Sequence, residues 1–188
     1  MASKLLTRRL VVGGCVALLG CNPGADLAPL PAYVPGNYRL GPGDQVRVIT
    51  FGEEHLTGEF RVDDQGRVAL PLLGAVDAAG RTPKELETEI AAGLDRGDYL
   101  RNPHVTVEVV AYRPIFVLGE INKPGQYPYQ PGMTFLTGVA VAGGFTYRAI
   151  QDYASVVRTI NGKASEGLIV QSSFLAPGDV MKVLERRF

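Results

Sequence analysis

Hydrophobic and polar positions alternate in short stretches along most of the chain. The alternation has a period of two in residues 45–49 and 105–109, which is typical of strands with one buried face. A short strand at residues 126–129 is predicted at a sheet edge, because Pro128 has no N–H to donate to a ladder. The remaining predicted strands cover residues 60–62, 67–70, 115–118, 154–160, 168–170 and 180–184.

A first helix is predicted from Pro83 to about residue 95. Thr82 suits the N-cap, Pro83 suits the first helical position, and Glu85 stands three residues after the cap. Apolar residues recur every four positions within this segment, which predicts one buried face. They are Leu86, Ile90 and Leu94.

A second helix is predicted over residues 135–142, with Thr134 as its cap. Gly143 and Gly144 are expected to end it. Two helices among many strands predict an α+β fold. The fold class is therefore expected to be α+β, with two small β-rich domains covering residues 38–112 and 113–188.

The N-terminus has the pattern of a secretory signal peptide. Residues 1–9 are basic and contain no acid, and residues 10–19 are apolar. This apolar run is about half the length that a membrane-spanning helix needs. A buried N-terminal helix is the alternative, but Pro23 and Gly24 break the pattern soon after Cys21.

The sequence Leu18, Leu19, Gly20, Cys21 resembles a bacterial lipobox. The resemblance implies cleavage before Cys21, lipidation of Cys21 and removal of residues 1–20. Cys15 has a similar setting but lies too close to Arg9 to leave an adequate apolar segment. In such lipoproteins an Asp after the lipidated cysteine signals retention at the inner membrane. Residue 22 is Asn, so the resemblance implies that the protein is located at the outer membrane.

Residues 21–37 are expected to form an extended tether after the lipidated cysteine, because Pro and Gly are frequent there. The whole chain has 188 residues, with 19 basic and 19 acidic side chains. The leader contains three of the basic residues and no acid, so the mature chain has a net charge of −3. This balance argues against a general nucleic-acid binder.

No catalytic, cofactor or metal site is predicted. His55 lies in a polar loop about fifty residues from His104, and Asp63 and Asp64 fall in a predicted hairpin turn between residues 60–62 and 67–70. Three tyrosines are candidate sugar contacts, with ordinary half-buried strand and turn positions as the alternative. They are Tyr127, Tyr129 and Tyr147.

A short motif occurs twice. Residues 40–46 and residues 175–181 each place a Pro-Gly turn and an Asp before an apolar strand. Both are predicted to be strand-entry turns without chemistry. Neither has the glycine spacing or the Lys-Ser/Thr ending of a phosphate loop.

Several motifs together resemble the bacterial polysaccharide export lipoproteins of the outer membrane, the Wza type. Each of these motifs is a Gly/Pro turn and is weak evidence by itself. Their order and spacing over some 150 residues make the resemblance specific. Those of the export domain are residues 38–46, 62–74 and 102–107; those of the following soluble-ligand-binding β-grasp domain are residues 117–127 and 142–145.

The resemblance implies a non-enzymatic, periplasm-facing protein that forms a homo-oligomeric ring for capsular polysaccharide or exopolysaccharide. It implies an inner-membrane polysaccharide copolymerase as partner. No amphipathic stretch follows Val183, where larger members carry a pore helix. A separate outer-membrane barrel protein is therefore expected to complete the route, unless the role is periplasmic only. The alternatives are a periplasmic carbohydrate-binding adaptor that forms no conduit and an enzyme acting on polysaccharide.

Overall fold

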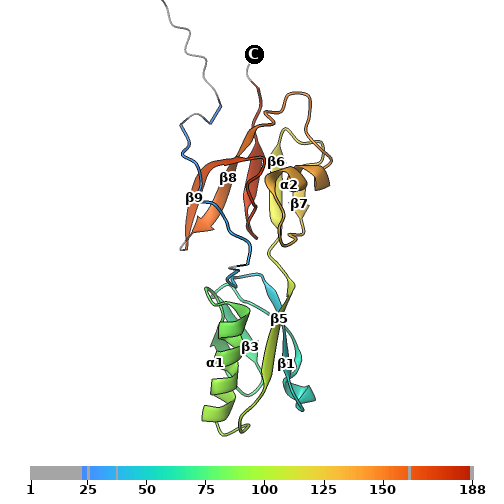
Figure 1. Cartoon of the computed structure of the whole chain (residues 1–188). Coiled ribbons are helices and arrows are strands. Elements are labelled where there is room, and N and C mark those ends of the chain that lie inside the picture. Colours follow the sequence, from blue (N-terminus) through green and yellow to red (C-terminus); the bar gives the residue numbers. More distant parts are fainter. Residues whose placement is uncertain (1–22, 25, 37, 161, 187–188) are drawn as a thin grey trace, which may run out of the picture.

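A computed structural model describes residues 23–24, 26–36, 38–160 and 162–186. It has two lobes placed end to end (Figure 1). Each lobe has its own apolar core and a single α-helix. The predicted α+β class with two small β-rich units is confirmed. The predicted leader and Cys21 lie outside the described residues.

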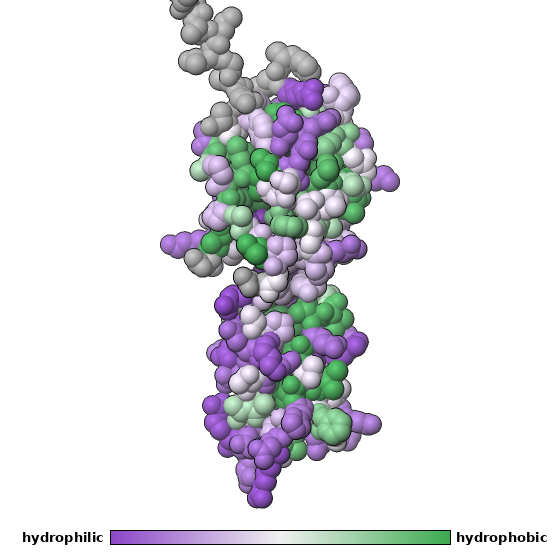
Figure 2. Space-filling view, viewed as in Figure 1, coloured by the Kyte–Doolittle hydropathy of each residue, from purple (hydrophilic) through white to green (hydrophobic). Residues whose placement is uncertain are grey.

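The N-terminal lobe combines two small sheets with helix α1 (Pro83–Arg96). The first sheet has the order β2-β1-β5, and the second pairs β3 with β4. Their bounds are β1 (Gln45–Thr50), β2 (Gly58–Arg61), β3 (Arg67–Leu70), β4 (Gly74–Asp77) and β5 (Val105–Ala111), with a 3-10 turn at Glu54–Leu56. In the common view of Figures 1 and 2, hydrophilic side chains cover the outer side of α1, as an amphipathic helix requires.

The capping box of α1 is present as predicted. The Thr82 hydroxyl accepts a hydrogen bond from the Glu85 N–H at 3.2 Å, and the Glu85 carboxylate accepts one from the Thr82 N–H at 2.7 Å. These bonds satisfy two donors that a helix N-terminus otherwise leaves unpaired. Leu86, Ile90 and Leu94 are all buried in the core of this lobe, as the periodicity predicts.

The predicted hairpin between residues 60–62 and 67–70 is wrong in its pairing. The turn at residues 63–66 does form, but only an isolated bridge from Val62 to Val68 joins its two arms. Strand β3 instead pairs over its whole length with β4. Strand β4 escapes prediction because Val76 is its single large apolar residue, so it has no alternating pattern.

The C-terminal lobe is a five-stranded sheet with helix α2 (Phe135–Val141) on one face. Its strand order is β7-β6-β10-β8-β9, with β10 parallel to β6 and the other pairs antiparallel. The bounds are β6 (Ile115–Gly119), β7 (Gly125–Tyr127), β8 (Tyr153–Ile160), β9 (Lys163–Val170) and β10 (Val180–Val183). Strand β7 is an edge strand and Thr134 caps α2, as predicted, but β7 ends at Tyr127 rather than continuing through Pro128.

The described residues of the segment expected to be an extended tether, 23–24 and 26–36, pack against the C-terminal lobe. Leu30 donates its N–H to the Leu168 carbonyl at 3.0 Å, and Leu168 donates to the Ala28 carbonyl at 3.0 Å. The Tyr153 hydroxyl donates to the Pro23 carbonyl at 3.0 Å. The segment thus covers the edge of β9, whose backbone groups would otherwise face solvent.

Among the described residues, no helix is long and apolar enough to cross a membrane.

Candidate functional site

The two lobes meet where two chain segments cross between them. Residues 112–114 connect β5 to β6, and the segment that includes residues 31–36 and 38–40 leads from the C-terminal lobe back to the N-terminal lobe (Figure 1). The repeated Pro-Gly turns of the sequence lie here: one leads into β1 and the other into β10. Polar and aromatic side chains from both lobes therefore come together at this junction.

Each of the two turns buries an aspartate. Asp44 is 0% exposed and Asp179 is 1% exposed. Each carboxylate accepts a hydrogen bond from the N–H three residues earlier, that of Gly41 at 2.7 Å and that of Ala176 at 2.8 Å. The repeat in the sequence is therefore a repeated structural unit. The turns do lead into strands as predicted, but each also holds an arginine.

Arg158, on β8, is the arginine of the second turn and makes four side-chain hydrogen bonds. Its guanidinium donates to the two carboxylate oxygens of Asp179 at 2.9 and 2.7 Å. It also donates to the carbonyls of Pro31 and Phe174, both at 3.2 Å. With 8% of the side chain exposed, Arg158 ties the segment before the N-terminal lobe to the core of the C-terminal lobe.

Arg113, between the lobes, is the arginine of the first turn. Its backbone N–H donates to Asp44 Oδ1 at 3.0 Å, and its Nε lies 3.4 Å from the same oxygen. A Cβ on Gly41 would lie 2.5 Å from Arg113 Nη1, so the guanidinium packs directly against this glycine. The side chain also passes Gly43 and Gly178. Arg113 therefore lies between the two turns.

Four tyrosines pack around the junction. The rings of Tyr38 and Tyr112 meet edge to face at 4.9 Å between centroids, and those of Tyr112 and Tyr129 meet at 5.6 Å. Tyr33 forms a hydrogen bond with Tyr129. The Tyr38 hydroxyl donates to Asp44 Oδ2. Burial, followed by the bond to this carboxylate, raises the pKa of Tyr38 far above its usual range.

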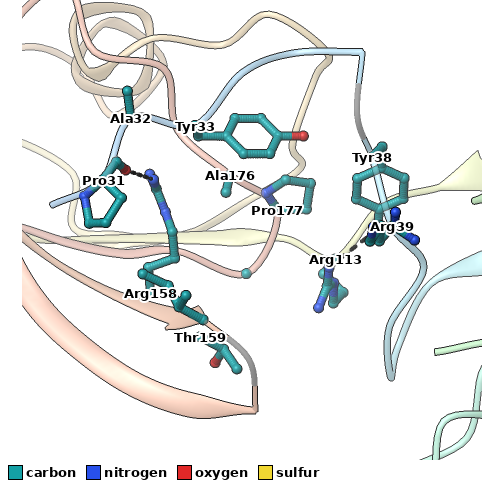
Figure 3. Close-up of a pocket in the computed structure, with 12 residues that line it drawn as sticks. Pro31, Ala32, Tyr33, Tyr38, Arg39, Arg113, Arg158, Thr159, Ala176 and Pro177 are labelled. Carbon is teal, nitrogen blue, oxygen red and sulfur yellow. Dashed lines mark hydrogen bonds between the residues drawn. The ribbon is translucent and has the colours of Figure 1, made fainter. Parts of the chain in front are cut away.

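Two cavities open beside these side chains. One, which we call the junction cleft, has a volume of about 320 Å³ and is shown in Figure 3. The residues used below from its lining are Pro31, Tyr33, Arg39, Arg113, Thr159 and Pro177. The other, of about 470 Å³, is lined by all four tyrosines together with Lys84 and Glu87. Both volumes fall within the range of small-molecule sites, roughly 300–1,000 Å³.

The three tyrosines predicted as sugar contacts are not brought together. Tyr129 lines the larger cavity, whereas Tyr127 and Tyr147 line neither. Tyr127 donates its hydroxyl to the Lys123 carbonyl at 2.6 Å, and Tyr147 is 88% exposed beyond α2. Prediction from the sequence missed Tyr33, Tyr38 and Arg113. The signal that marks their location is the repeated Pro-Gly-Asp turn.

The polar residues considered for chemistry have structural roles or stand apart. Asp63 accepts the N–H of Arg67 at 2.7 Å and so shapes its turn. Within the described parts of the chain, no group of three or more His, Cys, Asp or Glu side chains could hold a metal ion.

Comparison with known families divides the chain at the same junction. Residues 32–110 match the model of the polysaccharide biosynthesis/export protein family. Residues 114–169 match the model of the SLBB domain. The two models thus fall in succession on the N-terminal and C-terminal lobes.

Three relatives illustrate the similarity. The exopolysaccharide production protein ExoF of Rhizobium meliloti (strain 1021) is 34% identical over 118 residues, 57% of this chain and 28% of the relative. The EPS I polysaccharide export outer membrane protein EpsA of Ralstonia nicotianae is 27% identical over 200 residues, 88% of this chain and 51% of the relative. The polysialic acid transport protein KpsD of Escherichia coli is 28% identical over 122 residues, 64% of this chain and 22% of the relative.

The chain spans about half or less of the length of these relatives. EpsA is named as an export protein and KpsD as a transport protein, in agreement with the prediction that the chain is not an enzyme. The order of the two domain models, the relatives and the motifs of both lobes agree, and the chain belongs to the bacterial polysaccharide export family of the Wza type.

Proposed function

We propose that this protein is a lipid-anchored, periplasm-facing component of a machinery that exports capsular polysaccharide or exopolysaccharide, and that it forms a ring through which the polymer passes. The observation that carries the proposal is the succession of an export domain and an SLBB domain on two lobes stacked end to end. Relatives named for exopolysaccharide export and polysialic acid transport support it.

The path of the N-terminal segment supports an orientation relative to the outer membrane. Pro23 is held by Tyr153 at the start of β8, at the end of the C-terminal lobe that faces away from the junction. A lipid on Cys21, two residues earlier, would hold this lobe beside the membrane. The N-terminal lobe would then point into the periplasm, toward an inner-membrane copolymerase.

The lipid anchor is tested by mass spectrometry of the mature protein. We expect a diacylglyceryl group and cleavage before Cys21. The Cys21→Ser variant is expected to stay unprocessed and to leave the outer-membrane fraction, whereas Cys15→Ser serves as a matched control and is expected to be processed normally. An unmodified Cys21 in the mature protein would contradict the anchor.

A sheet face of the C-terminal lobe supports lateral contact between copies. Phe116 and Leu118 alternate on β6 on the face opposite the core and are 38% and 42% exposed. Lys182 of β10 lies beside Leu118 on the same face. A neighbouring copy would remove these apolar side chains from water.

The ring is tested by the mass of the lipidated protein in mild detergent. We expect a defined oligomer, and we expect Leu118→Glu to shift it toward the monomer. Gln151→Glu adds the same charge to an exposed loop of the same lobe and should leave the mass unchanged. A wild-type protein that stays monomeric at high concentration would contradict the ring.

A second candidate function is a periplasmic carbohydrate-binding adaptor that forms no conduit. The two cavities at the junction favour it, because they combine aromatic rings with charged side chains. A monomer with measurable affinity for glycans would support the adaptor over the ring. Loss of polysaccharide secretion on gene deletion, restored by the wild-type gene, is expected for either.

A further inference from the structure

The two arginines held by the repeated turns differ in how many of their donors are used. An arginine side chain has five N–H groups in one plane. The Arg158 side chain donates hydrogen bonds to four acceptor atoms. The side chain of Arg113 makes one hydrogen bond to another described residue, from Nη2 to the Tyr38 hydroxyl at 3.5 Å. Its Nε is buried without a hydrogen bond within that same set of residues.

The Arg113 side chain is the more accessible of the two arginines. The side chain is 27% exposed, against 8% for Arg158, and it forms part of the cleft lining. Figure 3 shows Arg113 below Tyr38, whereas the Arg158 guanidinium is directed to the Pro31 carbonyl. Both arginines line the cleft, but Arg158 makes four side-chain hydrogen bonds, whereas Arg113 makes one and is more exposed.

A second arginine lines the same cleft. Arg39 donates from Nη1 to the Gly80 carbonyl at 2.6 Å and contacts Glu85 at 3.3 Å. Its side chain is 59% exposed. Among described residues, its Nε and Nη2 make no further bonds, so both arginines can offer donors to one bound group.

Asp44 does not compete for that group. Its carboxylate is fully buried and accepts hydrogen bonds from two backbone N–H groups and the Tyr38 hydroxyl. It therefore orients Arg113 without presenting a negative charge to the cleft. Planar guanidinium groups bind carboxylates through paired N–H bonds, which are stronger than neutral hydrogen bonds.

The rest of the lining suits a sugar ring. Pro31, Tyr33 and Pro177 present apolar surface, and Thr159 supplies a hydroxyl that can donate or accept. A site of mixed apolar surface and a few polar groups is typical of small-molecule recognition. A uronic acid unit presents the matching chemistry, with an apolar ring face, several hydroxyls and one carboxylate.

We propose that the junction cleft binds a carboxylate-bearing sugar unit of the polysaccharide, with its carboxylate on Arg113 and Arg39. The assignment of the ligand to a polysaccharide rests on the proposed function. The position of the site between the lobes means that the bound sugar contacts both the export domain and the SLBB domain.

The test is isothermal titration of the purified full-length protein with trigalacturonic acid. The matched control ligand is its methyl ester, which keeps the ring and hydroxyls and removes the charge. We expect the acid to bind at least about ten-fold more tightly than the ester, since the ester cannot form charge-assisted hydrogen bonds with the guanidinium groups. Binding of the acid should also weaken as salt rises.

Two variants identify the site. Arg113→Lys keeps the charge opposite Asp44 but loses the planar donors, and Arg39→Gln changes an exposed side chain without disturbing the core; each should weaken binding of the acid about ten-fold. Arg96→Gln, on an exposed arginine of α1 far from the cleft, is the control and should bind as the wild type does. Thermal melts confirm that each variant is folded.

Equal binding of acid and ester, unchanged binding in both cleft variants, or binding of inorganic phosphate with no binding of the sugar acid would overturn the proposal. These outcomes concern sugar binding at the cleft and can be distinguished from failure of the proposed export function. A deletion strain whose secretion is restored by the wild-type gene would keep the export role, even where trigalacturonic acid fails to bind.

Discussion

Replacing Asp179 by Asn is expected to be one of the most destabilising single changes in the C-terminal lobe. The substitution removes the negative charge opposite Arg158 and breaks at least one of two hydrogen bonds of 2.9 and 2.7 Å. It leaves a guanidinium that is 8% exposed, whose remaining acceptors are two carbonyls and at most the one amide oxygen of the new side chain, all of them uncharged. Breaking a buried ion pair from one side costs about 3–5 kcal/mol.

That cost is large against the total stability of a domain, about 5–15 kcal/mol. In a lobe of this size, 1 kcal/mol changes the melting temperature by about 4–8 °C, so a loss of at least about 12 °C is expected. Urea unfolding followed by circular dichroism and tyrosine fluorescence measures the free energy. Tyrosine is the reporter because the chain has no tryptophan.

Two further variants make the reasoning refutable. Asp152→Asn removes an exposed charge from the same lobe and should change the free energy of unfolding by less than about 0.5 kcal/mol. Replacing both partners, Arg158→Met with Asp179→Leu, should recover much of the loss, since no charge is left buried and unpaired. A free energy of unfolding for Asp179→Asn within about 1 kcal/mol of the wild type would refute the assigned role of the pair.

Three more changes test other parts of the structure. Gly119→Ala would place a methyl group 2.1 Å from the Val183 carbonyl oxygen at a φ of +85°, and it should cost about 1–3 kcal/mol in urea unfolding. Gly125→Ala meets only an ordinary contact at 3.9 Å, and equal effects of the two changes would contradict the close approach. The N–H of Thr82 holds the pKa of Glu85 below its usual range, so Glu85 stabilises α1 above pH about 4.3, and this contribution is lost as pH falls through the lower folded pKa. Glu85→Ala should therefore make the free energy of unfolding depend less on pH below about 4.3, and an unchanged dependence would count against the capping box. Because the pKa of Tyr38 is raised, its contribution to stability is full below pH about 10 and is lost as pH rises toward the folded pKa. Tyr38→Phe should reduce this alkaline loss and remove a late-ionising tyrosine from an absorbance titration, and the account fails if wild type and variant titrate alike.

The elements best predicted from the sequence are those whose signals are local. The α1 helix follows from Thr82, Pro83 and Glu85 at its start and from the spacing of Leu86, Ile90 and Leu94. Strands β1 and β5 follow from their alternation. In each case the residues that specify the element lie inside it or next to it.

What escaped prediction depends on residues far apart in the chain. Strand β4 and the first half of β9 lack an alternating apolar pattern, and they are strands because partner strands supply their hydrogen bonds. The same holds for the site. Arg113 and Asp44 are 69 positions apart, and nothing near either residue indicates that the two meet. The repeated Pro-Gly-Asp turn was visible, but only the fold shows that its aspartates are buried.

The segment of residues 26–33 illustrates the same point. Its prolines exclude a helix and predict extended chain, which is what the structure has. Its packing on β9 depends on an open sheet edge more than a hundred positions later, to which Leu30 is hydrogen bonded. Composition predicts conformation here, but it does not predict contact.

The role in polysaccharide export is tested most directly by the amount of polysaccharide that cells release. A strain lacking this gene is compared with the same strain carrying the wild-type gene, and uronic acid and total sugar are measured in the medium, at the cell surface and in the periplasm. The account predicts that deletion lowers the released and surface polymer severalfold, with retention inside the cell, and that the wild-type gene restores release. Unchanged release from the deletion strain, in a background with no second copy of the gene, would contradict it.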